Sequence, residues 1–502
     1  MKKTETKRWR HTSPLAAIFY LGRIFKGITQ NAVQSLAPLA AFLYAAEGSL
    51  MTRIVVGISL FLAVTIIASV VRYWFFRFRI GDDRIRIREG VFNKKQLDIK
   101  FDRIQAINTE QNFIYRRFGL VNVTFDTAGS AKEEGHLPAV PNELAESLQA
   151  RIRREAPLRA DTAEGADAEP PSSRRRLLTL GSSDIVRVGI ADNRALVFLL
   201  LLGPLSEQID ERIGDVVNDR AEAYFESLQL GLLGGIALLA AIVFAVVAIL
   251  VLASIVGAFL RYHRFVLVAD EDVLRSTGGL LTRHEHSIRF NKIQSLLVRQ
   301  DVMRRFMGRF EMRARQASSG SGGRRDFKIP LLAADLVATL KSEVFGDELP
   351  DADLDPRSAE FRALHPQYRR SRILLAGVLP ALLAAATLAM PLGWFSLLLL
   401  LWIPIAALFV TVLYRKSGYQ VRPDGIVLRR GFFGYRMTAF LHRKVQRISL
   451  TQTVAQARRG VATLRFYLAS GSVKLPYIDH ALATRLRDYV LFRVESSRKA
   501  WH

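Results

Sequence analysis

The sequence predicts a multi-pass α+β membrane protein, with six transmembrane helices in three hairpins. Each hairpin is followed by a small β-barrel capped by a C-terminal helix. Three observations predict this fold. Several uncharged segments exceed the roughly 20 residues that cross a bilayer. The segments that follow them alternate apolar and polar residues, as strands do. Finally, Gly and Gln residues recur at constant offsets in three copies, which indicates an internal repeat.

Composition narrows the class of protein. Half of the 502 residues are hydrophobic, yet 71 Lys and Arg against 46 Asp and Glu give a formal net charge of +25. Apolar bulk with strong basicity fits either a nucleic-acid binder or a membrane protein with a basic cytoplasmic face. The chain has no Cys, which excludes disulfides, thiol catalysis and thiolate metal sites.

Four segments are long and apolar enough to cross a bilayer, and two shorter ones precede a strong segment in the same way. The strong segments are residues 54–76, residues 231–260 and the two halves of residues 373–413, which a Pro–Gly turn separates. The shorter segments are residues 32–46 and 195–206, for which a buried core helix or an interfacial segment is the alternative. Six spans in three pairs is the count that includes them all.

Removing the spans leaves three strand-rich blocks, two linkers and an N-terminal arm. The arm is basic and amphipathic, as helices on a membrane surface are. The linkers are acidic and poor in large apolar residues, so we expect disorder, with metal binding by their carboxylates as the alternative. The predicted order is arm 1–30, hairpin 31–76, domain 77–157, linker 158–176, juxtamembrane arm and hairpin 177–260, domain 261–345, linker 346–368, hairpin 369–414 and domain 415–498.

Four positions recur in each block around a basic–aliphatic–Gln tripeptide. A Gly stands fifteen residues before this Gln, a second Gln six residues after it and a second Gly fourteen residues after it. The first Gly lies where two strand-like runs meet, so we expect a turn there, and the second follows a short helical turn. We expect the glutamines to be structural, with ligand binding as the alternative. The twelve residues are Gly90, Gln105, Gln111, Gly119, Gly279, Gln294, Gln300, Gly308, Gly431, Gln446, Gln452 and Gly460.

This order of hairpin, repeated Gly and Gln motif and terminal helix resembles the bacterial pleckstrin-homology-like (PH-like) module of YdbS/YdbT-type membrane proteins. Three copies behind a basic arm resemble the three-copy YdbT form, over almost the whole chain apart from the linkers. The resemblance implies that each block is a PH-like split barrel. It implies no catalytic residue and no cofactor. It also implies a role in envelope maintenance or stress resistance, and a smaller membrane partner with a single PH-like domain. The second copy departs from the pattern in a Gly/Ser-rich insert at residues 317–326, where we expect a mobile loop.

Charge predicts the orientation in the inner membrane. Residues 207–226, between two spans, hold seven acids and two arginines, whereas basic clusters flank the hairpins. The positive-inside rule therefore places both termini and all three PH-like domains in the cytoplasm. We expect the basic clusters to contact anionic headgroups as well, with a role in orientation alone as the alternative. The residues concerned are Lys2, Lys3, Lys7, Arg8, Arg10, Arg174, Arg175, Arg176, Arg369, Arg370 and Arg372.

No motif for catalysis is present in the sequence. There is no P-loop, no G-x-S-x-G and no H-E-x-x-H. His284 and His286 fall on one face of an alternating strand, but no third ligand accompanies them, so a solvated strand face is favoured over a metal site. We therefore expect no enzyme, no metal and no cofactor.

Three function classes remain. Nucleic-acid binding is disfavoured, because positive-inside bias and anionic headgroups already account for many of the basic residues. The alternative function is a six-helix transporter or export component with regulatory cytoplasmic domains, but the spans lack the buried acids or lysines typical of an ion path. The preferred hypothesis is a non-catalytic platform that presents three PH-like domains at the membrane surface for binding or scaffolding, with anionic lipid headgroups as partners.

Overall fold

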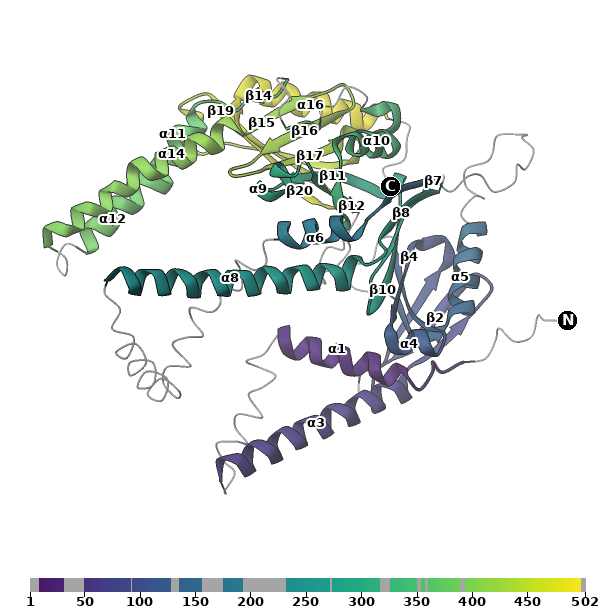
Figure 1. Ribbon diagram of the computed structural model, residues 1–502. Coiled ribbons are helices and arrows are strands. Elements are labelled where there is room, and N and C mark those ends of the chain that lie inside the picture. Colours follow the sequence, from purple (N-terminus) through teal and green to yellow (C-terminus); the bar gives the residue numbers. More distant parts are fainter. Residues whose placement is uncertain are drawn as a thin grey trace. The chain divides into compact units, whose positions relative to one another are not determined.

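The computed structural model describes residues 9–30, 49–91, 93–127, 135–155, 175–192, 232–270, 273–316, 326–349, 354–356, 360–388 and 393–497. The chain divides into two compact units. The first contains Met1–Arg175 and Val268–Arg289, with Ser319–Arg324. The second contains Arg176–Leu267, Phe290–Ser318 and Arg325–His502. Figure 1 shows the helices and strands of each unit in sequence colours.

The first copy begins with two helices and ends with the helix α5. Its elements are α1 (Ala16–Gln30), α3 (Leu50–Phe75), β1 (Arg77–Ile80), β2 (Arg84–Glu89), β3 (Lys95–Lys100), a 3-10 turn (Phe101–Arg103), β4 (Ile104–Asn112), α4 (Phe113–Arg117), β5 (Leu120–Thr127), β6 (Gly135–Pro141) and α5 (Asn142–Glu155).

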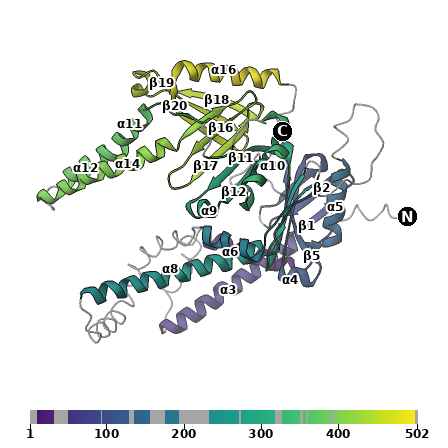
Figure 2. The ribbon, with the colours of Figure 1, turned by 45° about the horizontal axis from the view of Figure 1, so that its top comes forward.

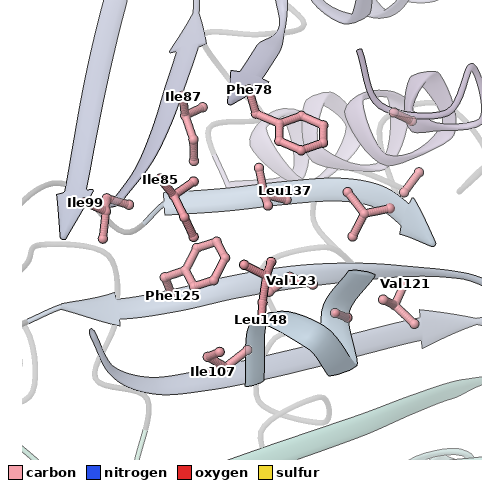
Figure 3. Close-up of a cluster of buried hydrophobic side chains, with 14 of the residues drawn as sticks. Phe78, Ile85, Ile87, Ile99, Ile107, Val121, Val123, Phe125, Leu137 and Leu148 are labelled. Atoms are coloured by element: carbon pink, nitrogen blue, oxygen red, sulfur yellow. The ribbon is translucent and has the colours of Figure 1, made fainter. Parts of the chain in front are cut away.

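The core of the first copy lies between its two groups of strands and α5. Phe78, Ile85 and Ile87 from β1 and β2 meet Phe125 and Leu137 from β5 and β6 in one cluster of buried side chains (Figure 3). In β1 and β2 the buried residues alternate with more exposed ones, as expected where one face of a sheet is buried, whereas β5 and β6 are buried over most of their length. Leu148 of α5 is part of the same cluster, so the terminal helix packs directly on the core.

The second copy begins with a strand and a short helix before its membrane segment. Its elements are β7 (Arg175–Thr179), α6 (Ser182–Ala191), α8 (Leu232–Tyr262), β8 (Val266–Asp270), β9 (Val273–Gly278), β10 (Thr282–Arg289), a 3-10 turn (Phe290–Lys292), β11 (Ile293–Gln300), α9 (Val302–Phe306), β12 (Phe310–Gln316), β13 (Phe327–Leu332) and α10 (Ala334–Phe345).

The third copy repeats the order. Its elements are a 3-10 turn (Gly346–Glu348), β14 (Arg362–Ala363), α11 (Gln367–Ile373), a π-helical turn (Leu374–Val378), α12 (Leu379–Thr387), a 3-10 helix (Gly393–Leu401), α14 (Trp402–Arg415), β15 (Gly418–Val421), β16 (Gly425–Arg430), β17 (Tyr435–Leu441), a 3-10 turn (His442–Lys444), β18 (Val445–Thr451), α15 (Val454–Ala457), β19 (Val461–Leu468), β20 (Gly471–Asp479) and α16 (His480–Ser496).

Successive copies share sheets. One seven-stranded sheet has the order β6-β5-β4-β10-β9-β8-β7, and the other has the order β13-β12-β11-β17-β16-β15-β14. Strand β4 of the first copy therefore pairs with β10 of the second, and β11 of the second pairs with β17 of the third, both antiparallel (Figures 1 and 2). The sequence predicts three separate barrels, whereas the structure joins neighbouring copies by backbone hydrogen bonds. We call these two pairings the first and second strand junctions.

Four helices in the described part of the chain are long and apolar enough to cross a membrane: Met51–Phe75, Leu233–Tyr262, Gln367–Thr387 and Gly393–Arg415. By length and composition they match the four strong segments expected from the sequence. The two shorter predicted spans, residues 32–46 and 195–206, lie outside the described residues.

The N-terminal arm packs on its own domain. Ala16 and Tyr20 of α1 belong to the core of the first copy. Ser69 of α3 donates a hydrogen bond from Oγ to the carbonyl oxygen of Ala17 at 2.5 Å. The apolar side of the amphipathic arm therefore has a partner within the protein, and its contact with the membrane surface stays a prediction.

The second linker is ordered over part of its length. Leu349 and Leu354 are buried, and Glu348 forms a 2.8 Å ion pair with Arg443. The disorder expected from its acidic composition is therefore wrong for these residues, because Leu349 and Leu354 are buried in the folded chain. Of the first linker, residues 158–174 lie outside the described residues, and Arg175 and Arg176 begin β7. All but Asp326 of the Gly/Ser-rich insert lies outside as well.

Candidate functional site

The first glycine of each motif occupies the same turn. A Cβ atom added to Gly90 or Gly279 would lie 2.0 Å from the backbone oxygen three residues further on, and one added to Gly431 would lie 1.9 Å from it. Gly90 and Gly279 also have φ of 106° and 119°. The turns between β2 and β3, β9 and β10, and β16 and β17 are therefore closed to any side chain.

The Gln of each tripeptide lies at a β-bulge. The register between β4 and β5 shifts across Gln105, that between β11 and β12 shifts across Gln294, and that between β18 and β19 shifts across Gln446. A bulge bends the strand and increases its twist. The tripeptide, whose first residue ends a 3-10 turn in all three copies, thus marks the bend from one group of strands to the next.

The second Gln of each motif braces the backbone nine residues further on. Its side-chain Nε2 donates to a carbonyl oxygen: Gln111 to Leu120 at 2.9 Å, Gln300 to Arg309 at 3.4 Å and Gln452 to Val461 at 3.0 Å. The second Gly follows the short helices α4, α9 and α15, and Gly119, Gly308 and Gly460 all have φ of 62°. These contacts give the motif residues a structural role, and in the second copy Gln300 and Gly308 also line a pocket of about 410 Å³.

The basic residues expected to contact lipid lie in several environments. Arg10 forms a backbone bridge with Phe78, Arg175 and Arg176 lie in β7, and Arg369, Arg370 and Arg372 lie in α11. Arg369 and Arg372 stack over the rings of Tyr414 and Tyr368. The remaining five, Lys2, Lys3, Lys7, Arg8 and Arg174, lie outside the described residues.

A row of arginines crosses the second strand junction. Arg430 of β16 lies opposite Arg436 of β17, and Arg436 lies opposite Arg299 of β11. Directly opposite residues project from the same face of a sheet with Cβ atoms about 5 Å apart, where like charges repel. We call Arg430, Arg436 and Arg299 the arginine row. At the equivalent position of the first junction, His284 lies 3.7 Å from Glu110, so two arginines do not face each other there.

The arginine row lines an open pocket of about 470 Å³. Lys474 of β20 and Arg315 of β12 add two more cations to its lining, and Asp301 is the one acidic residue there. Asp301 is already paired with Arg299 at 2.6 Å and with Arg304 at 2.6 Å. Within the described part of the chain, no carboxylate forms an ion pair with Arg430, Arg436 or Lys474.

The pKa values of the pocket cations are lowered because these cations are partly buried and lie close to one another. Burial lowers the pKa of Arg436, and the nearby Arg299 and Arg315 lower it further. Burial and neighbouring cations also lower the pKa of Arg430 and of Lys474, and Arg372 is one of those cations in both cases. An anion in the pocket would relieve the mutual repulsion of these groups.

The pocket adjoins a candidate membrane span. Leu413 of α14 is part of the pocket lining, two residues before the end of the span Gly393–Arg415. Phe432, also in the lining, stacks on Phe409 of the same helix with ring centroids 4.9 Å apart. The site thus combines uncompensated cations with an apolar wall that continues into the span.

Sequence reasoning singled out Arg372 but not the arginine row. The three residues of the arginine row come from three strands and two copies. In the sequence, each of them is an ordinary basic residue in a strand that alternates polar and apolar residues. A signal was present in the aligned copies, since the position of Arg299 and Arg436 is held by Glu110 and His284 at the first junction. His284 and His286 stack in parallel, 6.0 Å apart, and among the described residues no group of three potential metal ligands occurs.

Comparison with known proteins gives the class. The family model described as "Bacterial PH domain" matches the chain three times, at residues 32–156, 228–346 and 373–493. The chain therefore belongs to the bacterial PH domain family, and it is a membrane protein with three copies of that domain. It is similar to the UPF0699 transmembrane protein YdbT of Bacillus subtilis (strain 168), with 26% identity over 419 residues that cover 81% of each chain. No solved structure matches the chain.

Proposed function

We propose that the chain is a non-catalytic inner-membrane protein whose three PH-like domains form a binding or scaffold platform at the cytoplasmic membrane surface. Six transmembrane helices in three hairpins anchor the domains. We further propose that the arginine row binds the phosphate of an anionic phospholipid headgroup. The observation that carries this proposal is the cross-strand pairing of Arg299 with Arg436 beside the last apolar turn of α14.

Lipid is favoured over a soluble phosphate by the composition of the pocket. A headgroup ligand needs cations for its phosphate and an apolar surface for the start of its acyl chains, and Leu413 and Phe432 supply the latter. Each Lys or Arg near an anionic membrane surface contributes about 1 kcal/mol. Removal of three pocket cations should therefore weaken binding by about 3 kcal/mol, or roughly 100-fold.

A scaffold role follows from the number of domains. Three PH-like domains in one chain raise their effective concentration toward a shared ligand or partner. A smaller membrane protein with one PH-like domain is the partner that we propose on the basis of the family resemblance, with envelope maintenance or stress resistance as the setting.

The test uses the full-length chain in detergent and short-chain lipids. Native mass spectrometry would measure binding of dioctanoyl phosphatidylglycerol, dioctanoyl phosphatidylcholine and inorganic phosphate. We expect the anionic lipid to bind most tightly. A triple variant, Arg430→Gln with Arg436→Gln and Lys474→Gln, should lose that preference. A matched variant with the same loss of charge on exposed surface, Arg458→Gln with Arg459→Gln and Arg485→Gln, should keep it.

A structural role for the arginines predicts a different result. Arg436→Gln removes a like-charge contact, so we expect it to raise thermal stability without lipid while weakening lipid binding. Loss of stability with unchanged lipid binding would refute the headgroup site. Equal binding of both lipids by the wild-type chain would refute it as well, and tighter binding of inorganic phosphate than of lipid would assign the pocket to a soluble anion.

A further inference from the structure

Both strand junctions use the same register. The offsets are counted from the Gln of the tripeptide in each copy. In both junctions, the residue six positions after this Gln faces the residue eleven positions before the tripeptide Gln of the next copy. Gln111 faces Arg283 at the first junction (105 + 6 and 294 − 11), and Gln300 faces Tyr435 at the second (294 + 6 and 446 − 11). Strands β10 and β17 thus each pair with the strand that carries the repeated Gln in the copy before, β4 and β11.

Two strands of these same types have an open edge. In the described part of the chain, β3 ends the sheet β1-β2-β3, and β18 ends the sheet β18-β19-β20. Strand β3 is the counterpart of β10 and β17, whereas β18 is the counterpart of β4 and β11. An open edge presents unpaired backbone N–H and C=O groups, which are a template for strand addition.

Side-chain burial shows what β18 lacks. Leu296, Leu297 and Val298 of β11 are buried, with at most 4% exposure, where β11 pairs with β17. Their counterparts in β18 are Ile448, Ser449 and Leu450, and all three are half-exposed. Two aliphatic side chains on an open edge are left partly covered in the third copy, although the same strand positions are fully covered in the second.

We propose that β18 of one chain pairs with β3 of a second copy of this chain, in the register of the two internal junctions. The partner strand comes from a second copy because this chain carries both open edges. Strand β18 corresponds to β4 and β11, and β3 corresponds to β10 and β17, which are the strands that pair with each other inside the chain. Two such contacts, head to tail, would close a dimer without leaving an open edge of either type. The proposal does not depend on the lipid site.

The register names the residues that would meet. Thr451 (446 + 5) would face Lys95 (105 − 10), as Arg299 faces Arg436, and Leu450 would face Gln96, as Val298 faces Met437. Neighbouring pairs in an antiparallel ladder alternate between wide and close spacing, with Cα atoms about 5.5 and 4.5 Å apart. One of these two pairs should therefore have the geometry for a disulfide.

The chain has no natural cysteine, so any disulfide that forms between two copies must join the engineered cysteines. One tagged full-length copy would carry Thr451→Cys and a differently tagged copy Lys95→Cys. A second combination would use Leu450→Cys and Gln96→Cys. Co-expression and mild oxidation in membranes should give a covalent heterodimer in at least one combination. Arg447→Cys with Lys95→Cys is the matched control, four residues or roughly 13 Å out of register, and should give none.

A charge pair gives an independent readout in detergent. Thr451→Lys places two lysines opposite each other and should shift the population from dimer to monomer by about tenfold. Adding Lys95→Glu should restore the dimer. Absence of crosslinking in both combinations, with a monomeric wild-type chain, would overturn the proposal. It would also be overturned if both cysteines in one chain gave a disulfide and cysteines on separate chains gave none, because β18 would then close on β3 of its own chain.

Discussion

Arg304 and Glu311 form a 2.9 Å ion pair inside the second PH-like domain, with 2% of each side chain exposed. The other copies hold different residues at these positions. In the third copy, Gln456 donates from Nε2 to Thr463 Oγ1 at 3.0 Å, and in the first copy Tyr115 donates to the carbonyl oxygen of Leu15 at 3.0 Å. A buried polar contact between the short helix (α9 or α15) and the strand that follows it (β12 or β19) is therefore kept in the second and third copies by different chemistry.

The ion pair should be replaceable only as a pair. Arg304→Gln alone takes one of three cationic partners from the buried Glu311. Arg313 at 2.6 Å and Lys328 at 3.5 Å remain, so we expect the free energy of unfolding to fall by about 1–3 kcal/mol. Arg304→Gln with Glu311→Thr copies the neutral pair of the third domain and should recover most of that loss. Urea unfolding in detergent, followed by tryptophan fluorescence, would measure both. Additive losses in the double variant would contradict the prediction.

Lys444 should make stability depend on pH. Its Nζ donates to the carbonyl oxygen of Asn291 at 2.5 Å, and burial, with Arg443 and Lys292 nearby, lowers its pKa to about 8 from 10.5. The unfolded chain therefore binds more protons between about pH 8 and 10.5, so stability rises with pH across that window. The full difference would be about 3 kcal/mol as an upper bound. Thermal unfolding between pH 7 and 10.5 would show it.

The control for this titration is Lys444→Met. We expect it to be more stable than the wild-type chain at pH 7, because no charge is buried, and to lose the rise above pH 8. Equal slopes for both proteins would assign the pH dependence to other groups.

The repeated turn glycines should not tolerate alanine. Gly279→Ala would place a Cβ atom 2.0 Å from the carbonyl oxygen of Thr282, at a φ of 119° that L residues rarely adopt. We expect a loss of more than 2 kcal/mol in the free energy of unfolding. Gly22→Ala in α1 meets no atom within 4 Å and should be neutral or slightly stabilising. Similar losses for both variants would show that the turn is not the cause.

The orientation can be tested with reporter fusions. Alkaline phosphatase fused after Asp215 should be active, because the acidic segment between two spans is expected outside. Fusions after Ala168, Asp353 and His502 should be inactive, and green fluorescent protein at these three places should fluoresce. Phosphatase activity at any of the three would reverse the proposed topology.

Part of this architecture is readable in the sequence because it depends on local chemistry. The spans at 231–260 and 373–413 stand out by length without charge, since a bilayer core excludes charge wherever the segment lies. The offsets from Gly90 to Gln105 and Gly119 recur because each marks a turn, a bulge or a helix end with its own backbone requirement. These features need no knowledge of what the chain touches elsewhere.

The arginine row and the strand junctions were decided by the tertiary structure. Arg299 and Arg436 are 137 residues apart (436 − 299), and nothing local to either predicts that they face each other. Strand pairing joins backbone groups that are the same in every residue, so the alternation that predicts β10 or β17 does not say which strand lies at its edge. The sequence by itself determined three copies of one domain and their anchors. Only the folded chain decided that each copy completes the sheet of its neighbour, because edge hydrogen bonds are satisfied by position and not by side-chain identity.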